Sequence, residues 1–163
     1  MPSIIFEGPD GAGKSYIASY ISTVSKIPIY HAGGPPKTPE EIVERANKMV
    51  KMENKIFDRF PIISEQIYGT IVRDNNPFNF GDLKDIPFPV VYCRPFRETL
   101  LSSEKIEKDY KAGKHMKSVL EKYEQIIDKY DELMSSLPHL TFNRDLESCA
   151  DFLTRLERTI LRK

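Results

Sequence analysis

Short apolar runs alternate along the chain with longer segments in which apolar residues recur every three or four positions. Runs of the first kind are typical of strands buried on both faces, and segments of the second kind are typical of amphipathic helices. We expect strands at residues 3–7, 27–31, 56–57, 90–93 and 140–142. The alternation predicts an α/β fold with a five-stranded parallel sheet, covered by helices on both faces, whose ligands bind at the carboxyl ends of the strands.

Helices are expected between these strands, where the apolar period changes. The first begins at Lys14 and ends before Pro28. A second begins after Thr38, because Pro39 suits the first helical position and Glu41 completes a capping box with Thr38. Further helices are expected after Pro61, at residues 119–134 and at residues 152–160.

Length and charge narrow the classes of function. With 163 residues, the chain 1–163 has the size of one domain with one core. Its 24 basic and 24 acidic residues cancel, so no net field draws it onto long nucleic acid or an acidic membrane. Cys93 and Cys149 have neither a metal-binding nor a disulfide spacing, and no segment approaches the roughly 18 apolar residues that span a bilayer. We therefore expect a cytoplasmic protein with small charged ligands.

The segment EGPDGAGKS contains the pattern GxxxxGKS between an expected strand and an expected helix. In such a loop, glycines let backbone N–H groups face phosphate oxygens, and the helix N-terminus adds its positive dipole end. Lys14 is then expected to contact the β- and γ-phosphates of ATP, and the Ser15 hydroxyl to bind Mg²⁺. The predicted ATP-binding residues are Gly8, Asp10, Gly11, Ala12, Gly13, Lys14, Ser15 and Tyr16.

Asp58 and Arg59 directly follow the third expected strand, so they should lie at the same sheet edge as this loop. A carboxylate beside a phosphate-binding loop can hold Mg²⁺ through water. An isolated Asp-Arg pair is also common as a helix cap or a surface ion pair. The pair therefore supports a catalytic site only together with its neighbours.

The segments EGPDGAGKS and DRFPIISEQIYG together resemble the thymidylate kinase family of P-loop nucleoside monophosphate kinases. The resemblance implies a P-loop NTPase-type three-layer sandwich that transfers the γ-phosphate of ATP to dTMP or a related or modified deoxynucleotide. It implies that Asp10 contacts the acceptor sugar, that Arg59 holds the acceptor phosphate, and that Asp58 orients that phosphate or the metal. Ser64 and Tyr68 match polar positions near the acceptor, although a first-turn serine and a packed tyrosine explain them as well.

The chain departs from this family around the acceptor. The loop YHAGGPPK lacks the arginine that the family places after its second strand, and only His31 and Lys37 could replace it there. There is room for one helix before Asp58 where the family has several, so the acceptor-binding region is expected to be reduced. Ser64 also lies one residue later than in the family, and Gly11 stands where some members have a catalytic arginine. These differences leave the identity of the base open.

A basic stretch at residues 94–117 follows the fourth strand and predicts a lid over the donor phosphates. Cationic side chains that close over the transferred phosphoryl group stabilise its charge. Arg94 and Arg97 are therefore expected to be catalytic, together with Lys14, Asp58 and Arg59. The lysines of this stretch are more typical of a solvated helix face. Residues 143–145 follow the fifth strand, where adenine usually rests, but a plain turn explains them equally well.

Three functions remain open from the sequence. The first is the phosphorylation of a deoxynucleoside monophosphate. The second is a P-loop kinase that acts on a nucleoside, a modified nucleotide or a nucleotide within DNA, which the compact acceptor region favours. The third is a nucleotide-binding regulator without turnover, against which the Asp58-Arg59 pair argues. A homodimer is compatible with the sequence.

Overall fold

The computed structural model describes residues 1–34, 36–72, 83, 86–102, 106, 108, 111–113 and 116–162. The strands are β1 (Ile4–Glu7), β2 (Ile29–His31), β3 (Ile56–Asp58), β4 (Val90–Cys93) and β5 (Leu140–Phe142). The helices are α1 (Lys14–Ser25), α2 (Pro39–Met49), α3 (Pro61–Ile71), α4 (Arg97–Leu101), α6 (Met116–Ser135) and α7 (Cys149–Leu161). These elements confirm the expected order of strands and helices, and α4 is a further helix that the sequence analysis did not expect.

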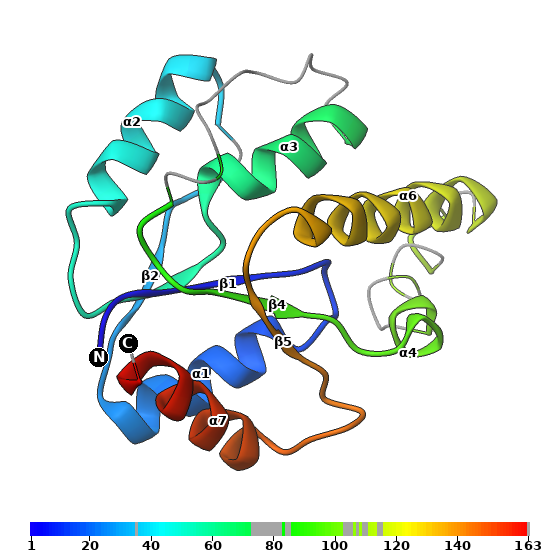
Figure 1. Ribbon diagram of the computed structural model, residues 1–163. Coiled ribbons are helices and arrows are strands. Elements are labelled where there is room, and N and C mark those ends of the chain that lie inside the picture. Colours follow the sequence, from blue (N-terminus) through cyan, green and yellow to red (C-terminus); the bar gives the residue numbers. More distant parts are fainter. Residues whose placement is uncertain are drawn as a thin grey trace.

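The five strands form one sheet in the order β2-β3-β1-β4-β5, and every described pairing is parallel. Helices cover both faces, with α1 and α7 on one face and α2, α3 and α6 on the other (Figure 1). The predicted α/β three-layer sandwich is therefore confirmed. Parallel pairing places the carboxyl ends of all five strands at one edge, where β1 runs into the glycine-rich loop.

Alternate residues of β1 divide the core between the two faces. Ile4 and Phe6 belong to a cluster with α1 and α7, whereas Ile5 belongs to a cluster with α2, α3 and α6. All three side chains are completely buried. This two-sided burial explains why the strands appear in the sequence as continuous apolar runs rather than as alternating ones.

The loop between β1 and α1 passes close to β4. Gly8 has a φ of 155°, and a Cβ built there would lie 2.6 Å from the carbonyl oxygen of Cys93. Gly13, which caps α1, has a φ of 87°, in the left-handed region that favours glycine. The glycines of the motif are therefore required by the path of the backbone as well as by phosphate chemistry.

The predicted cap of α2 is confirmed in part. The Thr38 hydroxyl accepts a hydrogen bond from the Glu41 backbone N–H at 3.2 Å, and Pro39 occupies the first helical position. The Glu41 carboxylate does not complete the box on Thr38, because it accepts the backbone N–H of Lys37 at 2.7 Å. The Glu41 carboxylate therefore bonds the backbone one residue before Thr38, where a capping box would have it bond Thr38 itself.

The expected lid at residues 94–117 lies only partly within the described residues. Of this stretch, residues 94–102, 106, 108, 111–113 and 116–117 are described, and the others lie outside. Lys108 and Lys111 are exposed, in agreement with a solvated helix face. None of the helices in the described part of the chain has the length and apolarity to cross a membrane.

Candidate active site

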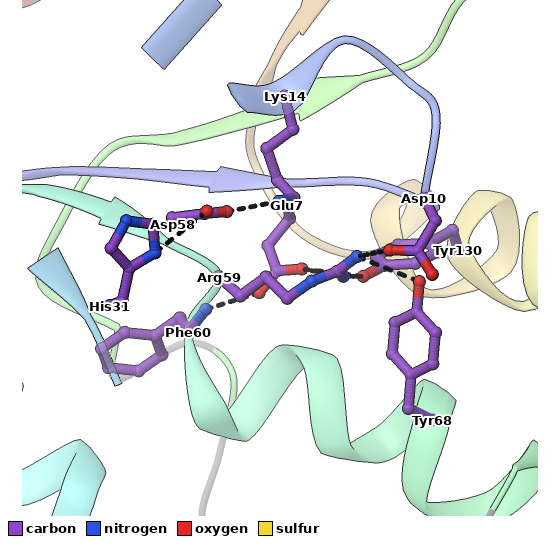
Figure 2. Close-up of polar contacts among 9 residues, drawn as sticks. All are labelled: Glu7, Asp10, Lys14, His31, Asp58, Arg59, Phe60, Tyr68 and Tyr130. Carbon is purple, nitrogen blue, oxygen red and sulfur yellow. Dashed lines mark hydrogen bonds and ion pairs between the residues drawn. The ribbon is translucent and has the colours of Figure 1, made fainter. Parts of the chain in front are cut away.

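Two pairs of opposite charges meet where β1 and β3 end. Lys14, in the first turn of α1, is ion-paired with Asp58 at the end of β3, and both side chains are largely buried. His31 lies beside Asp58 in the sheet register, and its Nδ1 is 3.2 Å from Asp58 Oδ2. Arg59 is ion-paired with Asp10 of the glycine-rich loop. Figure 2 shows the two pairs on either side of Glu7.

Arg59 is held by hydrogen bonds from several elements. Its Nη2 donates to Asp10 Oδ1 at 2.9 Å and to the Tyr68 hydroxyl at 3.1 Å, and its Nη1 donates to the Tyr130 hydroxyl at 2.6 Å. The guanidinium also lies 4.7 Å from the centre of the Tyr68 ring. Burial alone would lower the pKa of Arg59, but Tyr130, Tyr68, Glu7 and Asp10 together raise it above its ordinary value. The side chain therefore remains a cation at the edge of the sheet.

The backbone of Arg59 is also unusual, because its φ of 71° lies in the left-handed region. For a residue other than glycine this conformation costs about 1 to 3 kcal/mol. The Arg59 backbone N–H donates to the Phe6 carbonyl oxygen at 3.0 Å, which extends the pairing of β1 and β3 by one residue. This strained turn directs the guanidinium toward the glycine-rich loop.

Glu7 is the buried anchor of the arrangement. Its carboxylate accepts the backbone N–H of Phe60 at 2.6 Å and the Tyr130 hydroxyl at 2.9 Å, and Arg59 Nη1 lies 3.8 Å away. Burial raises the pKa of Glu7, although Arg59 and the Phe60 N–H lower it in part. Glu7 thus bonds Phe60, the residue after Arg59, and Tyr130, which accepts a hydrogen bond from the guanidinium, so it positions Arg59 from within the core.

A cavity of about 340 Å³ opens beside these pairs. It is lined by Asp10 and Lys14 of the phosphate-binding loop and α1, by residues 31–34 and 36 after β2, by Arg45 of α2, by Asp58 and Arg59, and by Pro61, Ser64, Glu65 and Tyr68 of α3. The structure thus brings together all four predicted acceptor-binding residues. Their contact with an acceptor remains a prediction.

Ser64 and Tyr68 also have structural partners. The Ser64 hydroxyl donates to the Phe60 carbonyl oxygen at 3.1 Å, one turn earlier in the chain. The Tyr68 hydroxyl is engaged by Arg59, and burial raises the pKa of Tyr68 to about 12. Ser64 therefore has the local role that its place near the start of α3 suggested. Tyr68 supports Arg59 directly from the cavity wall.

Three residues of the site were not identified from the sequence as site residues. Tyr130 of α6 joins Glu7 to Arg59, and Glu65 lies in the cavity wall. Arg45 donates to the Gly34 carbonyl oxygen and to Glu41 Oε1, each at 2.6 Å. An arginine thus reaches the loop after β2 from α2, although that loop has none of its own.

The two expected replacements for the loop arginine differ in position. His31 lies in the cavity wall with its side chain largely exposed. The Lys37 residue is exposed and is not part of the lining. Of the two, only His31 lines the cavity.

The predicted donor side lies along the loop and the N-terminus of α1. Gly11 and Gly13 both have positive φ, whereas Ala12 is buried and donates its N–H to the Pro9 carbonyl oxygen at 3.2 Å. Ser15 and Tyr16 are exposed. The Arg144 side chain lies against the loop at Gly13. A Cβ built on Gly13 would be 3.2 Å from both Cδ and Nη1 of Arg144.

The turn after β5 is hydrogen-bonded both within itself and to Phe96, at the start of α4. Asn143 Oδ1 accepts the Asp145 backbone N–H at 2.9 Å, and Asp145 Oδ2 accepts the Phe96 backbone N–H at 2.8 Å. These bonds fit a plain turn, whereas the position of Arg144 over the loop fits the adenine site. Both interpretations of residues 143–145 thus keep support.

The two predicted lid arginines are both bonded to α6. Arg94 donates from Nε and Nη2 to the two carboxylate oxygens of Asp131, at 2.9 and 3.1 Å. Arg97 donates from Nη1 to Asp128 Oδ1 at 2.8 Å. Neither is part of the cavity lining. Their catalytic role remains a prediction, and it requires them to leave these carboxylates.

The predicted magnesium ligands suit the metal chemically. Mg²⁺ prefers oxygen donors and is commonly held by one carboxylate together with substrate phosphates and water. Asp58 provides the carboxylate and Ser15 a hydroxyl at the start of α1. No group of three or more His, Cys, Asp or Glu side chains that could hold a metal occurs among the residues described.

No protein-family model matches the chain. Over 137 residues, 78% of this chain and 82% of the relative, the sequence is 28% identical to the SPbeta prophage-derived protein YorR of Bacillus subtilis. The crystal structure of YorR in complex with phosphorylated GDP is similar at a TM-score of 0.70 and 25% identity, covering 96% of this chain and 98% of YorR.

Two kinases have similar structures at lower identity. Deoxyadenosine kinase of M. mycoides, with dCMP and dCDP bound, matches at a TM-score of 0.61 and 18% identity, covering 97% of this chain and 99% of the kinase. Shikimate kinase of Acinetobacter baumannii matches at a TM-score of 0.65 and 16% identity, covering 99% and 94%. Neither of these two kinases is named as a thymidylate kinase. The chain has the fold of the P-loop kinases.

Proposed function

We propose that the protein transfers the γ-phosphate of ATP to the phosphate of a deoxynucleoside monophosphate. The observation that supports this proposal most directly is the pair of partly buried cations that line one cavity. Lys14 extends from the phosphate-binding loop and Arg59 from the end of β3, and both line the same space. A monophosphate acceptor brings a second phosphate to the reaction, and a second cation compensates its charge.

In the proposed step, an oxygen of the acceptor phosphate forms a bond to the γ-phosphorus of ATP. The bond from that phosphorus to the β–γ bridging oxygen breaks, which yields ADP and a deoxynucleoside diphosphate. Lys14 stabilises the donor phosphates, and Arg59 holds the acceptor phosphate in line with them. Mg²⁺, held by Ser15 and Asp58 when bound, neutralises charge on the donor phosphates.

The similar proteins support ligands of this class. YorR binds phosphorylated GDP, and the deoxyadenosine kinase binds deoxynucleotides, so nucleotides fit folds of this kind. The cavity of about 340 Å³ is within the ordinary range for small-molecule sites. A nucleotide acceptor is thus consistent with both the size and the charge of the site.

One observation favours a second candidate, a kinase that phosphorylates a hydroxyl group such as that of a nucleoside. A hydroxyl acceptor must lose a proton, whereas an ionised phosphate acceptor need not. The Asp58 carboxylate lines the cavity between Lys14 and His31, where it could accept that proton. Deoxyadenosine kinase, one of the similar structures, is named for such an acceptor.

A single assay separates these functions. The protein is incubated with ATP, Mg²⁺ and a panel of nucleosides, mono- and dinucleotides and oligonucleotides, and the products are resolved by mass. The proposal expects a diphosphate from at least one deoxynucleoside monophosphate. A monophosphate formed from a nucleoside would instead establish the second candidate. Binding of ATP without any phosphorylated acceptor would leave a nucleotide-binding regulator.

A further inference from the structure

Glu65 is a buried carboxylate in the wall of the acceptor cavity. Its residue is 5% exposed, and with Ser3 and Glu7 it makes up the buried polar and charged residues of the described chain. Glu7 anchors Arg59 and Ser3 bonds the backbone near β3, so both have structural roles. Glu65 also has contacts within the protein, and it lines the cavity. A group that costs free energy to bury here is placed where a ligand can meet it.

The fold makes room for this carboxylate at Gly69, one helical turn further along α3. A Cβ built on Gly69 would lie 2.6 Å from Glu65 Oε1 and 3.0 Å from its Cδ. Side chains at positions i and i+4 share one face of a helix, so any larger residue at 69 would displace the carboxylate. The absence of a side chain at Gly69 therefore allows Glu65 its position.

Different residues of the cavity wall offer different chemical groups to a ligand. Lys14 and Arg59 supply the cations that phosphate groups require. The loop after β2 contributes small residues to the wall, among them Ala32 and Gly33. Glu65 contributes a carboxylate, which when ionised accepts hydrogen bonds and donates none. A ligand group facing Glu65 should therefore present N–H donors.

We propose that Glu65 recognises the base of the acceptor and selects bases that carry an exocyclic amino group. This inference rests on the proposed nucleotide acceptor and deepens it. Guanine, adenine and cytosine offer amino N–H donors to a carboxylate, as in the known pairing of Glu or Asp with the cytosine amino group. Thymine and uracil offer one N–H between two carbonyl oxygens, and these oxygens repel a carboxylate. The preferred acceptor is thus not the thymidine nucleotide that the family resemblance implied.

The test measures selectivity between bases. The full chain is given ATP, Mg²⁺ and an equimolar mixture of dGMP, dAMP, dCMP and dTMP, and the ratio of initial rates gives the ratio of kcat/KM values. The best amino-bearing acceptor should exceed dTMP by about 10- to 100-fold. In Glu65→Gln this ratio should fall by about 10-fold or more, because an amide both donates to a thymine carbonyl and accepts its N–H.

Two further variants separate base recognition from effects on folding. Gly69→Ala should lower the same ratio, because its Cβ displaces Glu65, while α3 keeps or gains helical stability. Glu44→Gln makes the same chemical change at an exposed position of α2 outside the cavity, and its ratio should equal that of the wild type. A wild-type preference for dTMP, or an unchanged ratio in Glu65→Gln, would overturn the inference and leave the proposed function intact.

Failure of the proposed function gives a different result. If no monophosphate is phosphorylated, calorimetric titration of the four monophosphates into wild type and Glu65→Gln decides the role of Glu65. Tighter wild-type binding of amino-bearing monophosphates, reduced in the variant, would support recognition without transfer. Equal affinity for all four, or no binding, would overturn the inference.

Discussion

Arg59 Nη2 donates to Asp10 Oδ1 at 2.9 Å, which joins the residues assigned to the phosphate and to the sugar of one acceptor. In the proposed complex, Arg59 meets the acceptor phosphate and Asp10 meets the sugar. Each partner therefore compensates the charge of the other before an acceptor arrives. The bond also shows why the two side chains must be tested together, since loss of Asp10 changes the surroundings of Arg59.

Lys14→Ala should reduce turnover by at least about 10³-fold, because it removes the cation expected at the donor phosphates. Initial rates at saturating ATP check this expectation. Lys51→Ala removes an exposed lysine from the turn that follows α2 and should retain wild-type rates. Turnover of Lys14→Ala within about 10-fold of the wild type would place the donor phosphates elsewhere.

Gly8→Ala should lower the free energy of unfolding by about 2 to 4 kcal/mol. The added Cβ would lie 2.6 Å from the Cys93 carbonyl oxygen, and the φ of 155° is rarely adopted by alanine. Urea denaturation measures the change. Gly34→Ala is the matched control, since nothing lies within 4 Å of its Cβ, and it should shift stability by less than about 0.5 kcal/mol. Equal shifts in the two variants would contradict the close approach of Gly8 to β4.

Glu7 should make stability depend on pH. Burial raises its pKa above the usual 4.5, so the folded protein holds this proton more tightly than the unfolded chain. The resulting stabilisation is complete below about pH 4.5 and is lost as the pH rises through the pKa of the folded state. The unfolding free energy of the wild type minus that of Glu7→Gln should therefore decrease as the pH increases from about 4.5. Denaturation at a series of pH values tests this, and an increase of the wild-type value relative to that of Glu7→Gln with rising pH would contradict it.

Arg97→Ala should lower kcat by about 10²-fold with little change in ATP affinity, if Arg97 leaves Asp128 to reach the transferred phosphoryl group. Its ion pair with Asp128 is exposed, so stability should change by less than about 1 kcal/mol. Steady-state kinetics and denaturation are measured on the same preparation. Arg158→Ala, on the exposed face of α7, is the control. An unchanged kcat would assign Arg97 to the surface of α4.

The apolar pattern of the sequence predicted the sheet because a strand buried on both faces is a continuous run of apolar residues, which is visible locally in the sequence. The phosphate-binding loop was equally visible, because its chemistry depends on adjacent residues. The roles of Arg45 and Glu65 have no such local pattern in the sequence. Arg45 forms an i,i+4 pair with Glu41, which in a sequence indicates an exposed helix face, and Glu65 is one polar residue of an amphipathic helix.

Contacts between distant segments were the other part that the sequence could not show. Tyr130 meets Glu7 across 123 residues, and its spacing in α6 predicted only that it would be buried. The buried acid and the tyrosine become partners only when α6 packs on the sheet. The lid was predicted from charge alone, and charge does not distinguish a cation that closes over phosphate from one paired with a neighbouring helix, as Arg94 and Arg97 are.

The proposed contact of Asp10 with the acceptor sugar predicts a thermodynamic cycle. A hydrogen bond from a 3′-hydroxyl to this carboxylate should contribute about 10- to 150-fold to kcat/KM. The wild type should lose about that factor on a 3′-deoxygenated monophosphate, and Asp10→Ala should lose a similar factor on the normal one. Combining both changes should cost little more than either alone, because each removes the same contact. Arg59→Ala is the comparison variant, since it should weaken every monophosphate acceptor whatever its sugar. Its loss and that of the missing hydroxyl should multiply. If the losses for Asp10 and the hydroxyl also multiply in full, the two groups do not touch, and the sugar must bind elsewhere in the cavity.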